Sequence, residues 1–136
     1  MPHSEDCLRA QRLIVVDLSL RFIELNRDSY LPGVNLPDAA LLLMLAIKVF
    51  EAQMKGRPTT ASALARALEM PRPTLYRRLR QLIEHGLIEK QGQNFLMRID
   101  ALSKPKAVQE FKRRVSIIQQ AAQKLSELDK YRFPQH

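Results

Sequence analysis

The sequence predicts a mainly α-helical fold with one small β-hairpin. Apolar residues recur at three- and four-residue steps over most of the 136-residue chain, which is the spacing of amphipathic helices. Only a short stretch around residue 92 shows strand-like runs on either side of a glycine-containing turn. The length suits one domain with a hydrophobic core. We therefore expect a single domain over residues 1–136, with a core at 38–100 between flanking helices at 5–28 and 104–130.

Residues 5–28 are expected to form one helix with two opposed apolar faces. The first face contains Leu8, Val15, Leu18, Phe22 and Leu25. The second face contains Leu13, Val16, Leu20 and Ile23. A surface helix needs only one such face, so both sides of this helix should be covered. We favour a second subunit as the second cover, and burial between two helices of the same chain is the alternative.

The core begins with a loop at 31–37 that contains two prolines and a glycine. Asp38 can cap the next helix, which is apolar almost throughout and runs to about Met54. Such a helix belongs at the centre of the domain. A short helix at 61–68 follows, with Thr59 or Thr60 as its N-cap.

Residues 71–84 are expected to form the next helix, which ends before Gly86. Its apolar side contains Leu75, Leu79, Leu82 and Ile83. Its outward side contains Pro73, Tyr76, Arg77, Arg80, Gln81 and Glu84. A row of arginines can hold phosphates or guanine edges through paired hydrogen bonds. By itself this pattern also fits an exposed helix that uses arginine for solubility.

Short strands are expected at 87–90 and 95–99, on either side of Gln91-Gly92-Gln93-Asn94. A long final helix then runs from about 104 to 130. Its main apolar face has residues at three- and four-residue spacing: Val108, Phe111, Val115, Ile118, Ala122 and Leu125. Ile117, Ala121 and Leu128 lie beside this face and make it wider. This spacing fits a short helix–helix seam. The alternative is a helix that lies on its own core.

The net charge is +8, and it is distributed unevenly. Residues 57–98 contain eight basic and three acidic side chains, whereas residues 1–36 contain four basic and five acidic ones. A basic segment indicates an acidic partner such as nucleic acid or an anionic membrane face. The longest apolar run, 39–47, is too short to span a bilayer, and the N-terminus lacks a secretory signal pattern.

The sequence shows no pattern that predicts catalysis or metal binding. The three histidines are scattered, and one cysteine permits neither an internal disulfide nor a zinc finger. The acidic residues form no paired arrangement typical of general acid–base catalysis. We expect no enzymatic activity, no cofactor and no metal. Cys7 near the first helix start is either a redox-sensitive thiol or an incidental one, and Glu5 and Asp6 beside it oppose thiolate formation.

A short helix, a three-residue turn, a second helix with outward arginines and a hairpin follow one another in the order of a winged helix-turn-helix. Three segments carry a closer resemblance: Leu64-Ala65-Arg66-Ala67-Leu68, Thr74-Leu75, and Leu82-Ile83-Glu84-His85-Gly86-Leu87-Ile88-Glu89-Lys90. They resemble the MarR family of bacterial transcriptional regulators, and the IclR family shares much of this region. Leu102-Ser103-Lys104 resembles the entry to the final helix of MarR proteins. Two positions depart from the family pattern: Glu69 replaces the usual turn glycine, and the hairpin lacks the usual Asp-x-Arg.

The resemblance implies a cytoplasmic homodimer that binds pseudo-palindromic double-stranded DNA and has a possible small-molecule effector, often phenolic or oxidising. It also implies that the N- and C-terminal helices of two subunits intertwine. The expected dimer interface comprises Leu8, Val15, Leu18, Phe22, Leu25, Phe111, Val115, Ile118 and Leu125. No membrane association is expected.

We expect residues 73–84 to lie in a major groove. The predicted DNA-binding residues are Thr59, Thr60, Ser62, Arg72, Pro73, Thr74, Tyr76, Arg77, Arg80, Lys90, Gln93 and Asn94. Arg77 and Arg80 would contact phosphates or base edges, and the hydroxyls before the turn would hold phosphate. Arg78 fits an internal ion pair as well as a DNA contact. The alternative function is a winged helix used for protein–protein contact in a larger complex.

Overall fold

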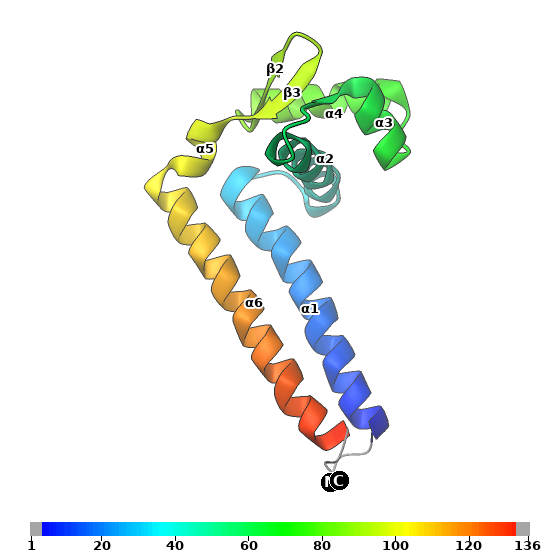
Figure 1. The fold of residues 1–136 in the computed structure, drawn as a ribbon, viewed down its shortest axis with the longest axis vertical. Coiled ribbons are helices and arrows are strands. Elements are labelled where there is room, and N and C mark those ends of the chain that lie inside the picture. The colour runs from blue at the N-terminus through cyan, green and yellow to red at the C-terminus, as the bar shows by residue number, and fades with distance from the viewer. Residues whose placement is uncertain (1–3, 133–136) are drawn as a thin grey trace.

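The computed structural model describes residues 4–132, which form a head and a long two-helix arm (Figure 1). The arm consists of α1 (Ser4–Tyr30) and α6 (Pro105–Arg132). The head consists of α2 (Leu36–Met54), β1 (Thr59–Thr60), α3 (Ala61–Leu68), α4 (Arg72–Glu84), β2 (Ile88–Gln91), β3 (Asn94–Met97) and α5 (Ile99–Ser103). The predicted fold class, mainly helical with a small wing between flanking helices, is confirmed.

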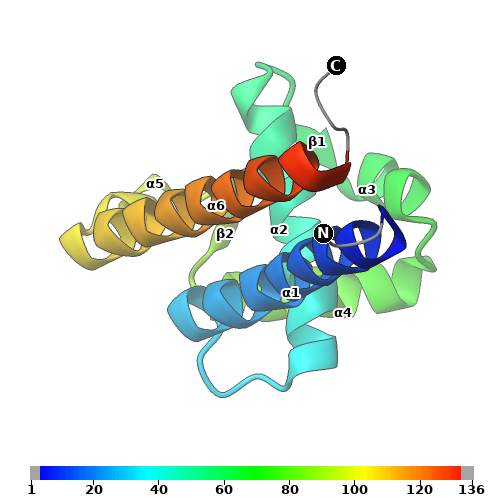
Figure 2. The same cartoon turned by 90° about the horizontal axis from the view of Figure 1, so that it is seen from below.

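The two arm helices lie side by side and run in opposite directions (Figures 1 and 2). Far from the head, Gln11 Nε2 donates a hydrogen bond to Asp129 Oδ1 at 2.6 Å. At the head end, Arg114 Nη2 donates to Tyr30 Oη at 2.9 Å. The first helix is therefore covered on one side by the last helix of its own chain, which is the alternative that the sequence left open.

Each arm helix keeps a second apolar face that this pairing leaves exposed. On α1 the exposed residues include Leu13, Val16 and Leu20. On α6 the helix packs through Ala107, Ile117 and Ala121, while Phe111 and Ile118 of the predicted seam are exposed. Within the chain, α6 therefore packs through residues beside the predicted seam, and the exposed seam residues Phe111 and Ile118 leave the expectation of a helix–helix contact with a second subunit as a prediction.

The core of the head is centred on α2, whose Leu42, Leu45 and Val49 are fully buried. Against it pack Leu75, Leu79 and Leu82 of α4, together with Ile88 and Phe95 of the sheet. Most of the predicted apolar side of α4 is confirmed by this packing.

The prediction fails at Ile83, which is 41% exposed. Successive helical residues differ by about 100° in direction. Ile83 therefore lies at one margin of the buried face, and Arg78 is buried at the other margin. The aliphatic part of an arginine can occupy such a margin if its guanidinium finds partners.

The wing is a three-stranded antiparallel sheet in the order β1–β3–β2. The hairpin turns at Gly92, whose φ of 61° favours glycine. β1 was not predicted, because a two-residue strand shows no periodicity; its Thr59 and Thr60 pair with Phe95 and Asn94. The prediction that the last strand includes Ile99 is wrong, since β3 ends at Met97 and Ile99 starts the unpredicted helix α5.

The N-terminus of α2 is capped by Asn35 rather than by Asp38, so that prediction is wrong. Asn35 Oδ1 accepts a hydrogen bond from the Asp38 backbone N–H at 2.9 Å, and Asn35 Nδ2 donates to Asp38 Oδ2 at 2.8 Å. Because Asn35 provides the cap, the second carboxylate oxygen of Asp38 is available to α4. It accepts a hydrogen bond from Arg78 Nη2 at 2.9 Å.

Arg78 thus forms the internal ion pair that the sequence allowed, and it links α4 to the start of α2. Its side chain is 10% exposed, whereas that of Asp38 is 40% exposed. Arg78 Nη1 also donates to Gln81 Oε1 at 3.1 Å, while the buried Nε has no partner. The hydrogen bonds from Asn35 and then Arg78 hold the pKa of Asp38 below its usual value of 3.8.

Truncation of the central core should lower stability strongly. Leu45→Ala removes a fully buried side chain of α2, and we expect the free energy of unfolding to fall by about 2–5 kcal/mol. Met44→Ala, which removes an exposed neighbour, should change it by less than about 1 kcal/mol. Urea denaturation of both variants measures the difference. Equal effects would contradict the placement of α2 at the core.

The ion pair predicts a pH-dependent effect of Asp38→Asn. Because the folded-state pKa of Asp38 is lowered, its carboxylate stabilises the fold above the ordinary value of 3.8 and loses this effect as the pH falls through the folded pKa. The variant should have a lower urea midpoint than the natural chain near neutral pH, and the two should converge below 3.8. Asp17→Asn, at an exposed position on α1, is the control and should show no such convergence. A constant deficit of the Asp38 variant at every pH would refute this role.

Candidate nucleic-acid interface

The start of α3 presents three hydroxyl side chains. Thr60 has an extended backbone and is the N-cap, and its Oγ1 accepts a hydrogen bond from the Ala63 backbone N–H at 3.3 Å. Thr59, Thr60 and Ser62 are all partly exposed. Of the two cap candidates, Thr60 is the one used. Hydroxyls beside the N–H groups of a helix start are suited to bind phosphate oxygens.

The turn between α3 and α4 accommodates Glu69 where the resemblance leads one to expect glycine. Glu69 adopts a left-handed conformation with φ 51° and ψ 43°. The following Met70 N–H donates to the Ala65 carbonyl at 3.0 Å and closes the end of α3. A non-glycine residue in this region costs about 1–2 kcal/mol. Glu69 therefore adds local strain to the turn, and it adopts the left-handed conformation that glycine would adopt more easily.

The beginning of α4 is linked to α3 by two predicted DNA-binding residues. Arg72 Nη2 donates a hydrogen bond to Ser62 Oγ at 3.0 Å. Pro73 occupies the first turn, where its missing N–H has no helical partner to lose. Thr74 is partly exposed beside them. This side of the helix-turn-helix therefore gathers hydroxyls and a guanidinium in one place.

Farther along α4, the exposed face presents Tyr76, Arg77 and Arg80. Among the side chains that the structure describes, neither arginine forms an ion pair. Their donors are therefore available to an external anion. Arg78, by contrast, points into the protein and is withdrawn from this face.

The wing residues Lys90, Gln93 and Asn94 are exposed. The Lys90 ammonium lies 5.9 Å from the centre of the Phe95 ring, a distance compatible with a cation–π interaction. Because Thr60 pairs with Asn94, the sheet joins the hydroxyls at the start of α3 to the wing. The predicted DNA-binding residues Thr59 and Thr60 of β1 and the wing strands thus belong to one sheet.

Two exposed arginines were missed in the choice of site residues. Arg57 lies in the loop that leads into β1, and Arg66 lies on α3. Neither forms an ion pair among the described side chains. The excess of basic residues in 57–98 indicated that further arginines could belong to the interface, but it did not show which of them are exposed. Arg98 differs, because Asp100 holds it at 3.0 Å.

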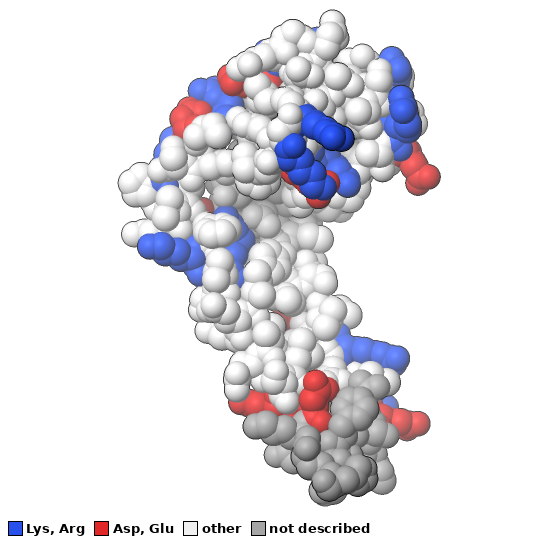
Figure 3. All heavy atoms as spheres, in the orientation of Figure 1, with Lys and Arg blue, Asp and Glu red and all other residues white. Residues whose placement is uncertain are grey.

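Charge is distributed differently over the two parts of the molecule (Figure 3). On the face shown, most of the visible Lys and Arg side chains lie over the head and its junction with the arm, whereas Asp and Glu side chains lie both on the head and near the far end of the arm. In the sequence, residues 1–36 are near neutral, whereas residues 57–98 and residues 99–136, which include α6, are both basic. Net charge alone therefore does not single out the head as the surface for a polyanion, and the unpaired arginines of the helix-turn-helix are the more specific observation.

The remaining predicted residues lie in the arm. Of the expected dimer interface, Val15, Phe111 and Ile118 are exposed, and Leu8, Leu18, Phe22, Leu25, Val115 and Leu125 are partly buried. Cys7 is buried, which shields its thiol from solvent oxidants. In residues 4–132 no cluster of His, Cys, Asp and Glu suitable for a metal is found. No helix in this range is long and apolar enough to cross a membrane.

Comparison with known proteins supports the assignment of the head. Residues 39–91 match the model of a family described as a helix-turn-helix domain. This range extends from α2 to the end of β2 and includes α3, the Glu69 turn and α4. Searches of curated proteins and of solved structures gave no match. From geometry and family match together, residues 39–91 form a helix-turn-helix domain.

Proposed function

We propose that this protein is a sequence-specific DNA-binding transcriptional regulator that lays α4 in the major groove. The observation that carries the proposal is the exposed face of α4. It holds Arg77 and Arg80 without ion pairs, in the second helix of a helix-turn-helix domain. That helix is the one that reads base edges in such domains. The Asp38–Arg78 pair supports it by fixing α4 against α2.

Within this proposal the residues have distinct roles. Arg77 and Arg80 contact base edges or phosphates, and Tyr76 packs against the DNA backbone. Arg72, Thr74 and the hydroxyls of Thr59, Thr60 and Ser62 position the domain on phosphates. Lys90, Gln93 and Asn94 add wing contacts to the backbone, but the wing lacks an arginine for the minor groove. Recognition of the DNA sequence therefore depends mainly on α4.

We further propose that the protein acts as a homodimer through the arm. The exposed apolar residues Val15, Phe111 and Ile118 support this, because isolated arms with such faces would present apolar surface to water. A twofold axis would place two copies of α4 about one duplex turn, roughly 34 Å, apart. The operator would then be pseudo-palindromic.

The type of regulator that fits best is the MarR type, acting in the cytoplasm and responding to a small-molecule effector. Support comes from the arrangement of the chain: the N- and C-terminal helices pack together, and the helix-turn-helix and wing lie between them in sequence. The rival function, protein–protein contact by a winged helix, would use the same surface without nucleic acid. DNA binding distinguishes the two.

Arg77→Ala/Arg80→Ala should abolish most of the DNA affinity. For the natural protein, a plot of log affinity against log salt should have a slope near −5, since about six phosphate contacts are expected per dimer. The double variant should bind at least about tenfold more weakly, because each lost charged contact is worth roughly 1–3 kcal/mol. Fluorescence anisotropy with duplexes selected from genomic fragments measures both quantities.

The matched control is Lys112→Ala/Arg113→Ala, which removes the same charge from exposed positions on α6. It should retain near-natural affinity. If both double variants lose affinity equally, general charge rather than α4 carries the binding. No binding to any duplex at low salt would favour the protein-contact function instead.

The dimer proposal predicts that Val15→Asp/Ile118→Asp yields monomers. Both positions are exposed and belong to the predicted interface, so buried carboxylates would oppose association. Sedimentation equilibrium should show dimers of the natural chain and monomers of this variant at the same concentration.

Leu13→Asp/Leu20→Asp is the comparison, because it alters the opposite apolar face of α1. Although this face is exposed and apolar too, the variant should leave the dimer intact, because the proposed interface uses the face that contains Val15. Dissociation by this second variant alone would move the interface to the other face of α1. A natural chain that sediments as a monomer would refute the dimer.

A further inference from the structure

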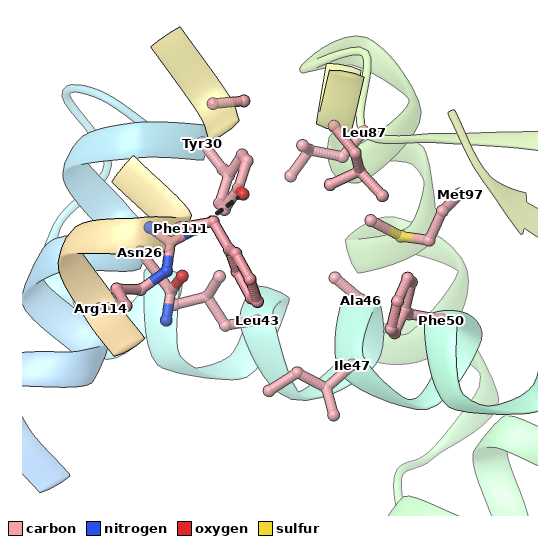
Figure 4. Close-up of a pocket in the computed structure, with 12 residues that line it drawn as sticks. Asn26, Tyr30, Leu43, Ala46, Ile47, Phe50, Leu87, Met97, Phe111 and Arg114 are labelled. Carbon is pink, nitrogen blue, oxygen red and sulfur yellow. Dashed lines mark hydrogen bonds between the residues drawn. The ribbon is translucent and has the colours of Figure 1, made fainter. Parts of the chain in front are cut away.

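The helix α1 carries a stripe of exposed apolar residues. Leu13, Val16 and Leu20 lie at three- and four-residue spacing and are 64%, 65% and 49% exposed. Another side of α1 pairs with α6 and borders an apolar pocket next to the head, where Arg114 of α6 donates a hydrogen bond to Tyr30 of α1 (Figure 4). Neither α6 nor the head covers the stripe. An exposed apolar surface of this kind is typical of an interaction site.

One exposed charge lies at each end of the stripe. Arg9 lies one turn before Leu13, and Glu24 lies one turn after Leu20, on the same side of the helix. Both charged side chains are exposed, and neither forms an ion pair among the residues that the structure describes. Next to Glu24, Ile23 packs against the core of the head. The free stripe therefore extends from Arg9 to Glu24.

The stripe has the same spacing when it is followed in either direction. The midpoint between Leu13 and Leu20 is also the midpoint between Arg9 and Glu24. When two copies of α1 pack antiparallel about this midpoint, Leu13 of each copy lies opposite Leu20 of the other copy. Arg9 of each copy then lies opposite Glu24 of the other, so both ends join a positive charge to a negative one. A parallel pair would place like charges opposite each other at both ends.

A hollow on this face of α1 has the form that such a pair requires. Its lining includes Arg9, Arg12, Leu13 and Val16, which are residues i, i+3, i+4 and i+7 of the helix. Four residues at this spacing form the hole that accepts one side chain of a facing helix. In the antiparallel pair, the side chain that faces this hole is Leu20 of the other copy. The two copies would therefore fill each other's hollows.

We infer that a second copy of the protein docks on this stripe, with α1 packed antiparallel against α1. A foreign helix with charge of one sign would be attracted at one end of the stripe and repelled at the other. The reversed copy matches the apolar centre and both charged ends. No other described element of the same chain covers these residues.

This contact differs from the proposed dimer interface, which uses the face of the arm that contains Val15, Phe111 and Ile118. Two different twofold contacts on one chain link dimers into tetramers or larger assemblies. The stripe involves one short pair of helices. Such assemblies should therefore form at higher protein concentrations than the dimer.

The antiparallel contact also sets the direction of the heads. α1 runs from the far end of the arm to the head (Figure 1), so the two heads lie at opposite ends of the contact. The assembly would present DNA-binding surfaces on two sides and hold two separate DNA segments together. This consequence rests on the proposed function, whereas the association itself requires no DNA.

Charge reversal tests the contact, using sedimentation velocity of the full chain over a concentration series without DNA. Arg9→Glu and Glu24→Arg should each raise the dissociation constant of the contact at least about tenfold, because each replaces two attractive contacts by two repulsive ones. The double variant Arg9→Glu/Glu24→Arg should recover the natural association. An equimolar mixture of the two single variants should recover it too, since every end then joins opposite charges.

The matched control is Arg21→Glu, which makes the same charge change at an exposed position of α1 outside the stripe. It should leave the association unchanged. Leu13→Asp/Leu20→Asp should abolish the contact while the dimer through the other face remains. If that dimer does not form, the charge variants should act on a monomer–dimer equilibrium instead, so failures of the two contacts are distinguishable.

Three results would overturn the inference. The first is a natural chain in which no association step responds to reversal of Arg9 or Glu24. The second is a double variant or a mixture that does not recover association. The third is association that is lost in Leu13→Asp/Leu20→Asp but insensitive to charge reversal, which would mean that a different segment covers the stripe.

Discussion

The burial of the apolar residues of α2 on three sides governs the structure, while Met44, Ile47, Phe50 and Met54 of the same helix stay exposed. This helix is apolar through most of its length, and a chain of 136 residues has few elements with which to cover it. α4 covers one side, the sheet covers another, and the end of α1 reaches a third. The orientation of α4 follows from this packing, since its Leu75, Leu79 and Leu82 must face α2. The arginines on the opposite side of α4 are then necessarily presented to solvent.

The Asp38–Arg78 pair refines that arrangement. Apolar packing alone allows a helix to slide or rotate slightly, because it has little directional preference. A charged hydrogen bond from the buried margin of α4 to the first turn of α2 restricts this freedom. The cost is a buried Nε without a partner. The pair therefore orients α4, the helix that we propose contacts DNA, and also stabilises the fold.

Most of the head could be predicted from sequence because each signal there is local. Helical spacing, the Thr60 cap and Gly86 placed α3 and α4 closely, and the exposed positions of Arg77 and Arg80 followed from the same spacing. Local signals failed where the decisive contact is distant in sequence. β1 exists because β3 pairs with it, and Thr59 pairs with Phe95, which lies 36 residues later in the sequence. The choice of Arg78 over Ile83 for the buried face depends on Asp38, which lies in another helix.

In the arm, the spacing of apolar residues is not enough to predict the packing. A spacing of three and four residues identifies an apolar face but does not say which element covers it. The chain itself covers one face of α1 and covers Ala107, Ile117 and Ala121 of α6. It leaves Leu13, Val16, Phe111 and Ile118 exposed. The pocket beside Arg114 was likewise invisible, because its lining comes from segments that are far apart in the sequence.

The central claim is that α4 contacts DNA directly. The measurement that tests it most directly is an amide chemical-shift footprint of the protein on a duplex recovered by affinity selection. Our account predicts that the largest shifts occur at 72–80, with smaller ones at 59–62 and in the wing. Shifts confined to the arm, or an unchanged α4 at saturating DNA, would contradict it.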